Sequence, residues 1–143
     1  MSISTSDILN HISAIHTYSL AAYLRWTAPY FAPEQQEERD TLDVIIADQE
    51  RTVDKIGAII IDMREVVIGG EFPLDYTSYH DLGFDYLLGK LIENETEIIE
   101  KVTKCVNALP EDSEFRAVAE EVLGNDKAHL EMLQELQDGA ATS

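Results

Sequence analysis

Cysteine, proline and glycine are all scarce in this chain of 143 residues. Cys105 is the single cysteine, which excludes an intrachain disulfide and predicts a reduced, buried thiol at the edge of an apolar stripe. Only four prolines and seven glycines occur, and most of them fall between long stretches with helical periodicity. At 45% hydrophobic residues the chain can fill one core. These features predict an all-α fold with one domain over residues 1–143.

Basic residues are also few: 10 stand against 28 acidic residues, for a formal charge of -18. Such a charge repels phosphate backbones and anionic lipid, so we expect no nucleic-acid binding. Long hydrophobic runs that could span a bilayer are missing, and the N-terminal MSISTSDILN lacks the basic flank and apolar run of a signal peptide. The sequence therefore predicts a cytoplasmic protein that does not bind membranes.

Four helices are predicted, over about residues 6–30, 34–67, 80–109 and 113–137. Capping residues and breakers set these limits: Thr5-Ser6-Asp7, Pro33, Gly69-Gly70, Pro110, and Asp112 or Ser113. The polar tail DGAATS is expected to fray. Short links make the helices of each pair antiparallel, whereas the long connector EFPLDYTSYHD lets the second and third helices run parallel. The expected architecture is an up-down-down-up four-helix bundle.

A carboxylate interrupts the apolar stripe of the third predicted helix. At about 100° per residue, Glu95 falls near the midline of this stripe, which consists of Leu88, Leu91, Ile98, Ile99, Val102, Val106 and Leu109. Burial of an unpaired charge costs several kcal/mol. Glu95 therefore requires a cation, a hydrogen-bond network or a metal ion as its partner.

The last helix offers the best partners for Glu95. Asp126 and His129 are spaced i, i+3 and lie on one apolar face, together with Phe115, Ala119, Val122, Leu133 and Leu136. A carboxylate oxygen and an imidazole nitrogen suit iron, manganese or zinc. Three side chains that can bind a metal ion are thus expected to point toward one core.

The first two helices offer weaker candidates. Glu50 lies at the margin of the expected apolar side of the second helix, formed by Leu42, Ile46, Val53, Ile56, Gly57 and Ile60, and it could equally be solvated. His16 lies within the stripe of Ile12, Tyr23 and Tyr30, where a histidine is often an ordinary core residue. His11 is a second candidate in a shifted alignment.

The order of elements and the carboxylate-x-x-His pair of the last helix resemble the ferritin-like superfamily, especially its bacterioferritin, rubrerythrin and Dps-like branches. That family holds two metal ions with a Glu on helix one, E-x-x-H on helix two, a Glu on helix three and E-x-x-H on helix four. The resemblance implies a metal site built from His16, Glu50, Glu95, Asp126 and His129. Val53 stands at the position of the helix-two histidine, so the implied site is incomplete.

Three function classes follow. The first is a metal-binding bundle, with iron as the expected ion and zinc or manganese as alternatives, that stores or oxidises iron or reacts with peroxide. The second is a metal-free bundle in which Glu95 and His129 pair directly, serving as a structural or interaction module. In the third, aromatic residues near the helix ends anchor a protein partner: Trp26, Tyr30, Phe31, Phe72 and Tyr76. The resemblance also implies a homodimer or higher homo-oligomer.

Overall fold

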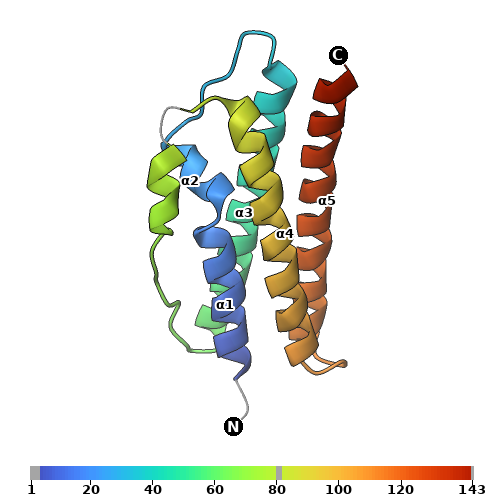
Figure 1. Ribbon diagram of the computed structural model, residues 1–143. Helices are drawn as coiled ribbons and strands as arrows, with labels where there is room; N and C mark the ends of the chain where they lie inside the picture. Colours follow the sequence, from blue (N-terminus) through green and yellow to red (C-terminus); the bar gives the residue numbers. More distant parts are fainter. Residues whose placement is uncertain (1–3, 80–81, 143) are drawn as a thin grey trace.

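The computed structural model describes residues 4–79 and 82–142, and within these ranges it is helical without any strand (Figure 1). The elements are α1 (Thr5–Thr17), α2 (Leu20–Trp26), α3 (Gln36–Asp62), the 3-10 helix η1 (Leu74–Tyr79), α4 (Phe84–Ala108) and α5 (Glu114–Thr142). The predicted all-α class is confirmed. The predicted start of the third helix at residues 80–81 lies outside the described residues.

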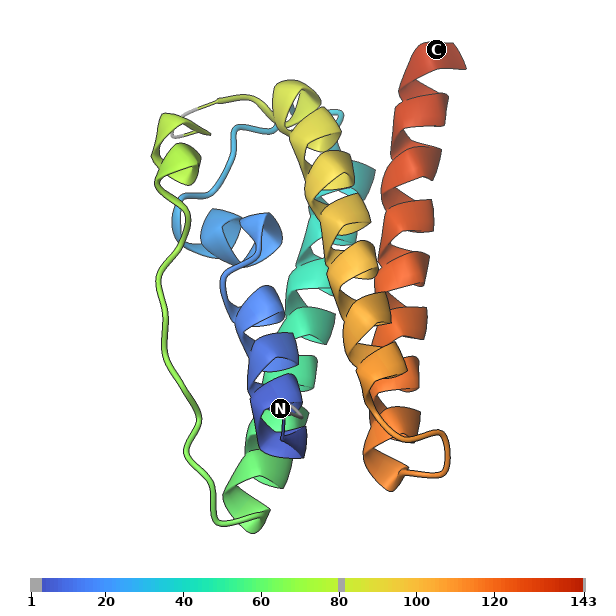
Figure 2. The same cartoon turned by 60° about the horizontal axis from the view of Figure 1, so that its bottom comes forward.

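The helices α1, α3, α4 and α5 lie side by side along their length (Figures 1 and 2). Helix α3 runs opposite to α1, α4 runs in the same direction as α3, and α5 returns beside α4. The segment after α3 passes along the outside of α1 and α2 to reach η1, as Figure 2 shows. The side chain of Asn10 holds this segment, because it donates to Val66 O at 3.0 Å and accepts from Ile68 N–H at 2.8 Å.

The prediction of one continuous first helix over residues 6–30 is wrong, because the helix breaks at Tyr18 and Ser19. Ser19 is extended, with φ -70° and ψ 162°, and its hydroxyl accepts from Ala22 N–H at 3.1 Å to cap α2. The N–H of Leu20 donates to Asn94 Oδ1 at 3.1 Å. These contacts stabilise the break. Tyr30 lies beyond α2 and is 64% exposed, so its predicted place on the apolar stripe is also wrong.

Two other predicted boundaries need correction. Helix α3 ends at Asp62, before the expected limit at Val67, because Arg64 takes a left-handed conformation (φ 61°) and Glu65 N–H donates to Ile60 O at 3.1 Å. Helix α5 continues to Thr142, so the tail does not fray after residue 137. Gly139 costs only about 1 kcal/mol relative to alanine, which is too little to end a helix. Of the two predicted caps of the last helix, Asp112 and Ser113, the structure uses Ser113, whose hydroxyl accepts from Phe115 N–H at 3.1 Å.

The core has two apolar clusters with polar side chains between them. One cluster includes Leu9, Ile56, Val102 and Val122. The other cluster lies toward the opposite end of the bundle and includes Leu24, Ile45, Leu87 and Leu133. Between the two clusters along the helices is what we call the polar layer, formed by the buried residues His16, Ser19, Gln49, Glu95, Asp126 and His129.

None of the helices in the described ranges has the length and apolar character needed to cross a membrane. Cys105 is a buried free thiol, as expected, and burial raises its pKa.

Candidate metal centre

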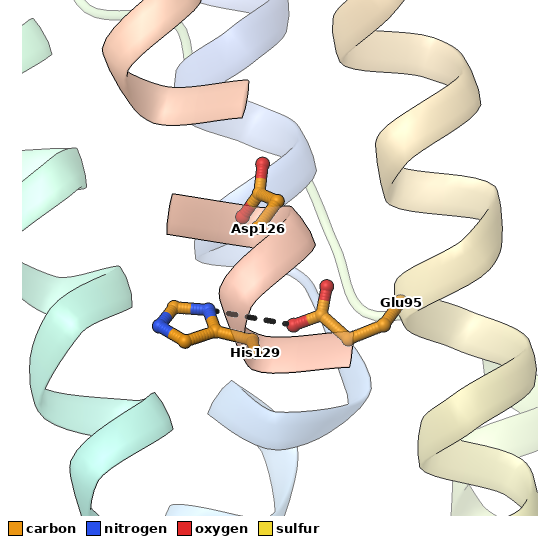
Figure 3. A group of neighbouring side chains, drawn as sticks. All are labelled: Glu95, Asp126 and His129. Atoms are coloured by element: carbon orange, nitrogen blue, oxygen red, sulfur yellow. Dashed lines mark ion pairs between the residues drawn. The ribbon is translucent and has the colours of Figure 1, made fainter. Parts of the chain in front are cut away.

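Helices α4 and α5 bring three predicted ligands together. Glu95, Asp126 and His129 are 3%, 1% and 2% exposed, and they offer one ligand atom each within 4.8 Å of one another. Figure 3 shows Glu95 extending from α4 toward His129 and Asp126 on α5, with His129 Nδ1 3.8 Å from Glu95 Oε1. These three residues could hold a metal ion.

The distances suit one ion. Nitrogen and oxygen ligands lie about 2.0–2.2 Å from zinc, so two of them on the same ion are at most about 4.4 Å apart. The 3.8 Å between His129 Nδ1 and Glu95 Oε1 is inside that limit. Where the ligand atoms approach the 4.8 Å bound, side-chain shifts of less than about 0.5 Å would bring them into range.

Two buried atoms of this cluster have no hydrogen-bond partner among the described residues: Glu95 Oε2 and His129 Nδ1. Buried polar atoms are nearly always satisfied, so each exception indicates a missing partner or a strained site. Both atoms are of types that bind transition metals. The donor set therefore fits a metal ion.

Asp48 determines which nitrogen of His129 is available. His129 Nε2 lies 2.9 Å from Asp48 Oδ2, and because a carboxylate only accepts, Nε2 carries the hydrogen. Asp48 also forms an ion pair with Arg51. His129 Nδ1 is then left with its lone pair. At metal sites a histidine commonly binds the ion through one ring nitrogen and donates the hydrogen of the other nitrogen to a carboxylate.

Gln49 orients the carboxyl group of Glu95. The Ser19 hydroxyl donates to Gln49 Oε1 at 2.6 Å, and Gln49 Nε2 donates to Glu95 Oε1 at 3.0 Å. The break between α1 and α2 thus serves the site, because the cap residue of α2 also fixes the amide of Gln49. This series of hydrogen bonds from Ser19 through Gln49 engages Glu95 Oε1 and leaves Glu95 Oε2 without a hydrogen bond.

His16 holds Asp126 and is not itself one of the three clustered ligands. Its Nδ1 donates to Ile12 O at 2.8 Å, and its Nε2 lies 3.0 Å and 2.9 Å from the two oxygens of Asp126. Both nitrogens therefore donate, which requires the imidazolium form. Burial alone would lower the pKa of His16, but the hydrogen bond and the charge of Asp126 outweigh it and raise the pKa above 6.5.

The remaining charges follow from burial. Burial, reinforced by the charge of Asp126, raises the pKa of Glu95 from 4.5 to about 8, so Glu95 is protonated at neutral pH. Burial also lowers the pKa of His129, and the positive charges of His16 and Arg51 act in the same direction against the pull of Asp126. The contact between His129 and Glu95 drawn in Figure 3 thus joins two neutral groups at neutral pH.

The structure does not bring Glu50 into this cluster. Its side chain is 45% exposed and pairs with Arg25 at 2.6 Å. Leu42, Ile56 and Ile60 of α3 are buried as predicted. In the middle of the helix the prediction is wrong, because Ile45, Gln49 and Thr52 are buried there, whereas Ile46 and Val53 are only partly so. His11 is exposed.

Sequence reasoning missed Asp48 and Gln49. Gln49 could have been found, because it lies four residues after Ile45 and seven before Ile56, on the same helical face. Asp48 carried no such signal: it is adjacent to that face, and its role depends on the neighbouring α5.

Comparisons of the chain with known protein families, curated proteins and solved structures found no match.

Proposed function

We propose that this protein binds one transition-metal ion through Glu95, Asp126 and His129. The observation that carries the proposal is the pair of buried atoms without hydrogen bonds, Glu95 Oε2 and His129 Nδ1, in one three-residue cluster. One imidazole with two carboxylates suits iron, manganese or zinc. A bound ion supplies Lewis-acid chemistry and, if it is iron or manganese, electron transfer.

The residues around the cluster prepare it for a cation. Asp48 keeps the hydrogen of His129 on Nε2, and Gln49 fixes one oxygen of Glu95. His16 orients Asp126, although its positive charge acts against a cation beside it. Contacts of this kind orient the ligands and raise metal affinity. Metal binding requires the loss of the proton on Glu95, since a ligating carboxylate is ionised.

We further propose that the protein is a ferritin-like bundle whose metal site has fewer ligands than the two-metal site of that family. The parallel course of α3 and α4 around a long connector supports this relation (Figure 1). Iron remains the first candidate ion on this basis, with iron oxidation, iron storage or peroxide chemistry as the activities implied. Because Glu50 pairs with Arg25 and His16 with Asp126, the arrangement supports one ion better than two.

A metal-free bundle is the second candidate, and one observation favours it. His16 neutralises Asp126, and Glu95 is protonated at neutral pH, so the polar layer carries no unbalanced buried charge without a metal. In that case the polar layer would serve to fix the register of the helices, a role known for some buried polar groups.

Metal content and thermal stability separate the two candidates. Protein purified without chelator should contain up to one equivalent of iron, manganese or zinc by elemental analysis. Added Fe²⁺ (without oxygen), Mn²⁺ or Zn²⁺ should raise the melting temperature, since a ligand at 100 times its Kd stabilises by about 2.7 kcal/mol.

The variant His129→Leu should lose this response, whereas His11→Leu, the same change at an exposed position of α1, should keep it. Absence of metal together with no thermal response to any of the three ions would leave the metal-free bundle as the function.

A further inference from the structure

A cavity of about 350 Å³ lies between the end of α1, helix α2, helix α3 and the segment that follows α3. This volume is in the lower part of the range for small-molecule sites, about 300–1,000 Å³. Three aromatic side chains, Tyr18, Trp26 and Phe72, line it together with aliphatic residues. Tyr18 and Phe72 meet edge to face, with ring centroids 5.4 Å apart.

The buried polar residues that line this cavity already make hydrogen bonds. His16 and Gln49 are 1% and 3% exposed and line the cavity from the polar layer. His16 donates to Ile12 O and Asp126, while Gln49 accepts from Ser19 and donates to Glu95. His16 therefore has no hydrogen left for a ligand, and Gln49 has only the second hydrogen of its amide nitrogen, so the buried part of an occupant should be mainly apolar.

Charged side chains line the exposed part of the cavity. Arg25 and Glu50 neutralise each other, with Nη1 and Oε1 2.6 Å apart. Asp54 has no ion pair or hydrogen bond with any residue in the described part of the chain. Because Glu50 balances Arg25 and Asp126 balances the imidazolium of His16, Asp54 leaves the cavity with a net negative charge. The charge of -18 on the whole chain adds to the attraction for cations.

We propose that this cavity binds a small aromatic amine in its protonated form. The aromatic ring packs against Tyr18, Trp26 and Phe72, and the ammonium group lies at the exposed end near Asp54. The aromatic residues recognise the ring of the ligand through burial, and the carboxylate of Asp54 recognises the ammonium through charge; one face of Trp26 is taken by the guanidinium of Arg25, 5.0 Å from the ring centroid. The proposal is independent of the metal site, because no lining atom needs a metal ion to be in place.

Trp26 makes the test specific, because it is the single tryptophan of the chain and lines the cavity. Chelator-treated protein is titrated with 2-phenylethylammonium while the fluorescence of Trp26 is followed. The matched control ligand is 3-phenylpropanoate, which has a similar ring and chain but a negative charge. We expect a saturable change with the amine and binding of the carboxylate that is weaker by about tenfold, because Asp54 attracts the amine and repels the carboxylate.

Three variants locate the site. Asp54→Asn should weaken amine binding by about fivefold, the effect of one exposed charge pair, whereas Asp43→Asn, an exposed acid of α3 outside the cavity, should leave it unchanged. Val53→Phe should fill the cavity and abolish binding. If Val53→Phe does not fold, the proposal is still tested by the comparison of the two ligands and by the comparison of Asp54→Asn with Asp43→Asn.

Three results would overturn the proposal. The first is no saturable change up to about 10 mM amine, a concentration at which even weak specific binding would appear. The second is equal binding of the amine and the carboxylate. The third is equal amine binding by Asp54→Asn and by the unchanged protein. Metal titrations of the same protein are unaffected by these outcomes, so the metal site is judged separately.

Discussion

His129 donates its Nε2 hydrogen to Asp48 at 2.9 Å, which leaves His129 Nδ1 with a lone pair 3.8 Å from Glu95 Oε1. His129 belongs to α5 and Asp48 to the neighbouring helix α3. A contact outside the ligand cluster thus decides which imidazole nitrogen can bind a metal ion. Predictions about the site therefore concern Asp48 as much as the three ligands.

Replacement of Asp48 by asparagine should weaken metal binding. The neutral amide accepts a weaker hydrogen bond from His129 and no longer increases the basicity of Nδ1, and loss of such a contact costs about 10–100-fold in affinity. Competition with a chromophoric chelator, using Mn²⁺ or Zn²⁺, measures the change. The control is Glu50→Gln, two residues along α3, whose side chain pairs with Arg25 and should not alter affinity. Equal affinities for both variants would remove Asp48 from the site.

Metal affinity should rise with pH until Glu95 is ionised. Because the pKa of Glu95 is raised to about 8, a metal ion has to displace its proton at lower pH. The apparent affinity for Mn²⁺ should therefore increase by up to about tenfold per pH unit between about pH 6 and pH 8, and level off above. Isothermal titration at several pH values measures it. A flat profile would mean that Glu95 is not a ligand.

Glu95 should also destabilise the metal-free protein as pH rises. The folded pKa of about 8 exceeds the unfolded value of 4.5, so between these values the folded state holds a proton that the unfolded state lacks. Stability from this group is complete below pH 4.5 and falls by at most about 1.4 kcal/mol per pH unit toward pH 8. Urea unfolding at several pH values should show this contribution to the slope in the unchanged protein and not in Glu95→Gln. Subtraction of the two curves removes the titration of His16 and His129.

The His16 and Asp126 pair should show strong coupling. Removal of one partner leaves the other as a buried charge without compensation, at a cost of about 3–5 kcal/mol, whereas removal of both does not. His16→Leu and Asp126→Leu should each lower the free energy of unfolding by more than about 1.5 times the loss in the double variant. A double-mutant cycle by denaturant unfolding tests this, and additive effects would contradict the ion pair.

Ser19 should contribute more to stability than an ordinary helix cap. It caps α2 and also donates to Gln49 within the core, so Ser19→Ala removes a cap and leaves a buried amide oxygen unpaired. We expect a loss of about 2–4 kcal/mol in the free energy of unfolding. Ser4→Ala removes the exposed cap of α1 alone, which should cost about 1 kcal/mol. Equal losses would show that the bond to Gln49 has no energetic effect.

Local patterns were enough to predict the all-helical class and the burial of Glu95, Asp126 and His129. The apolar stripes of α4 and α5 are regular, so any polar residue on them stands out. His16 is buried on the same face as Ile12, as predicted, although that prediction assumed one continuous helix reaching Tyr30.

Other features depend on contacts between distant parts of the chain. The break at Ser19 is stabilised by Asn94 and Gln49 from other helices, which no local signal reveals. On α3 the isoleucine pair at 45 and 46 allowed two phases of the apolar stripe, and the wrong one favoured Glu50 over Gln49. Packing against α1 and α5 decides the phase, and with it the neighbours of the site.

The clustered ligands all belong to the hairpin of α4 and α5, whereas their supporting groups come from α1 and α3. The supporting contacts span 46 residues for Gln49 and Glu95, 81 for Asp48 and His129, and 110 for His16 and Asp126. Contacts distant in sequence carry a larger entropic cost of loop closure. A partly folded chain in which only the hairpin of α4 and α5 had formed would hold the three proposed ligands together, but would lack the groups that set their protonation. Acquisition of metal would then depend on the docking of the N-terminal half.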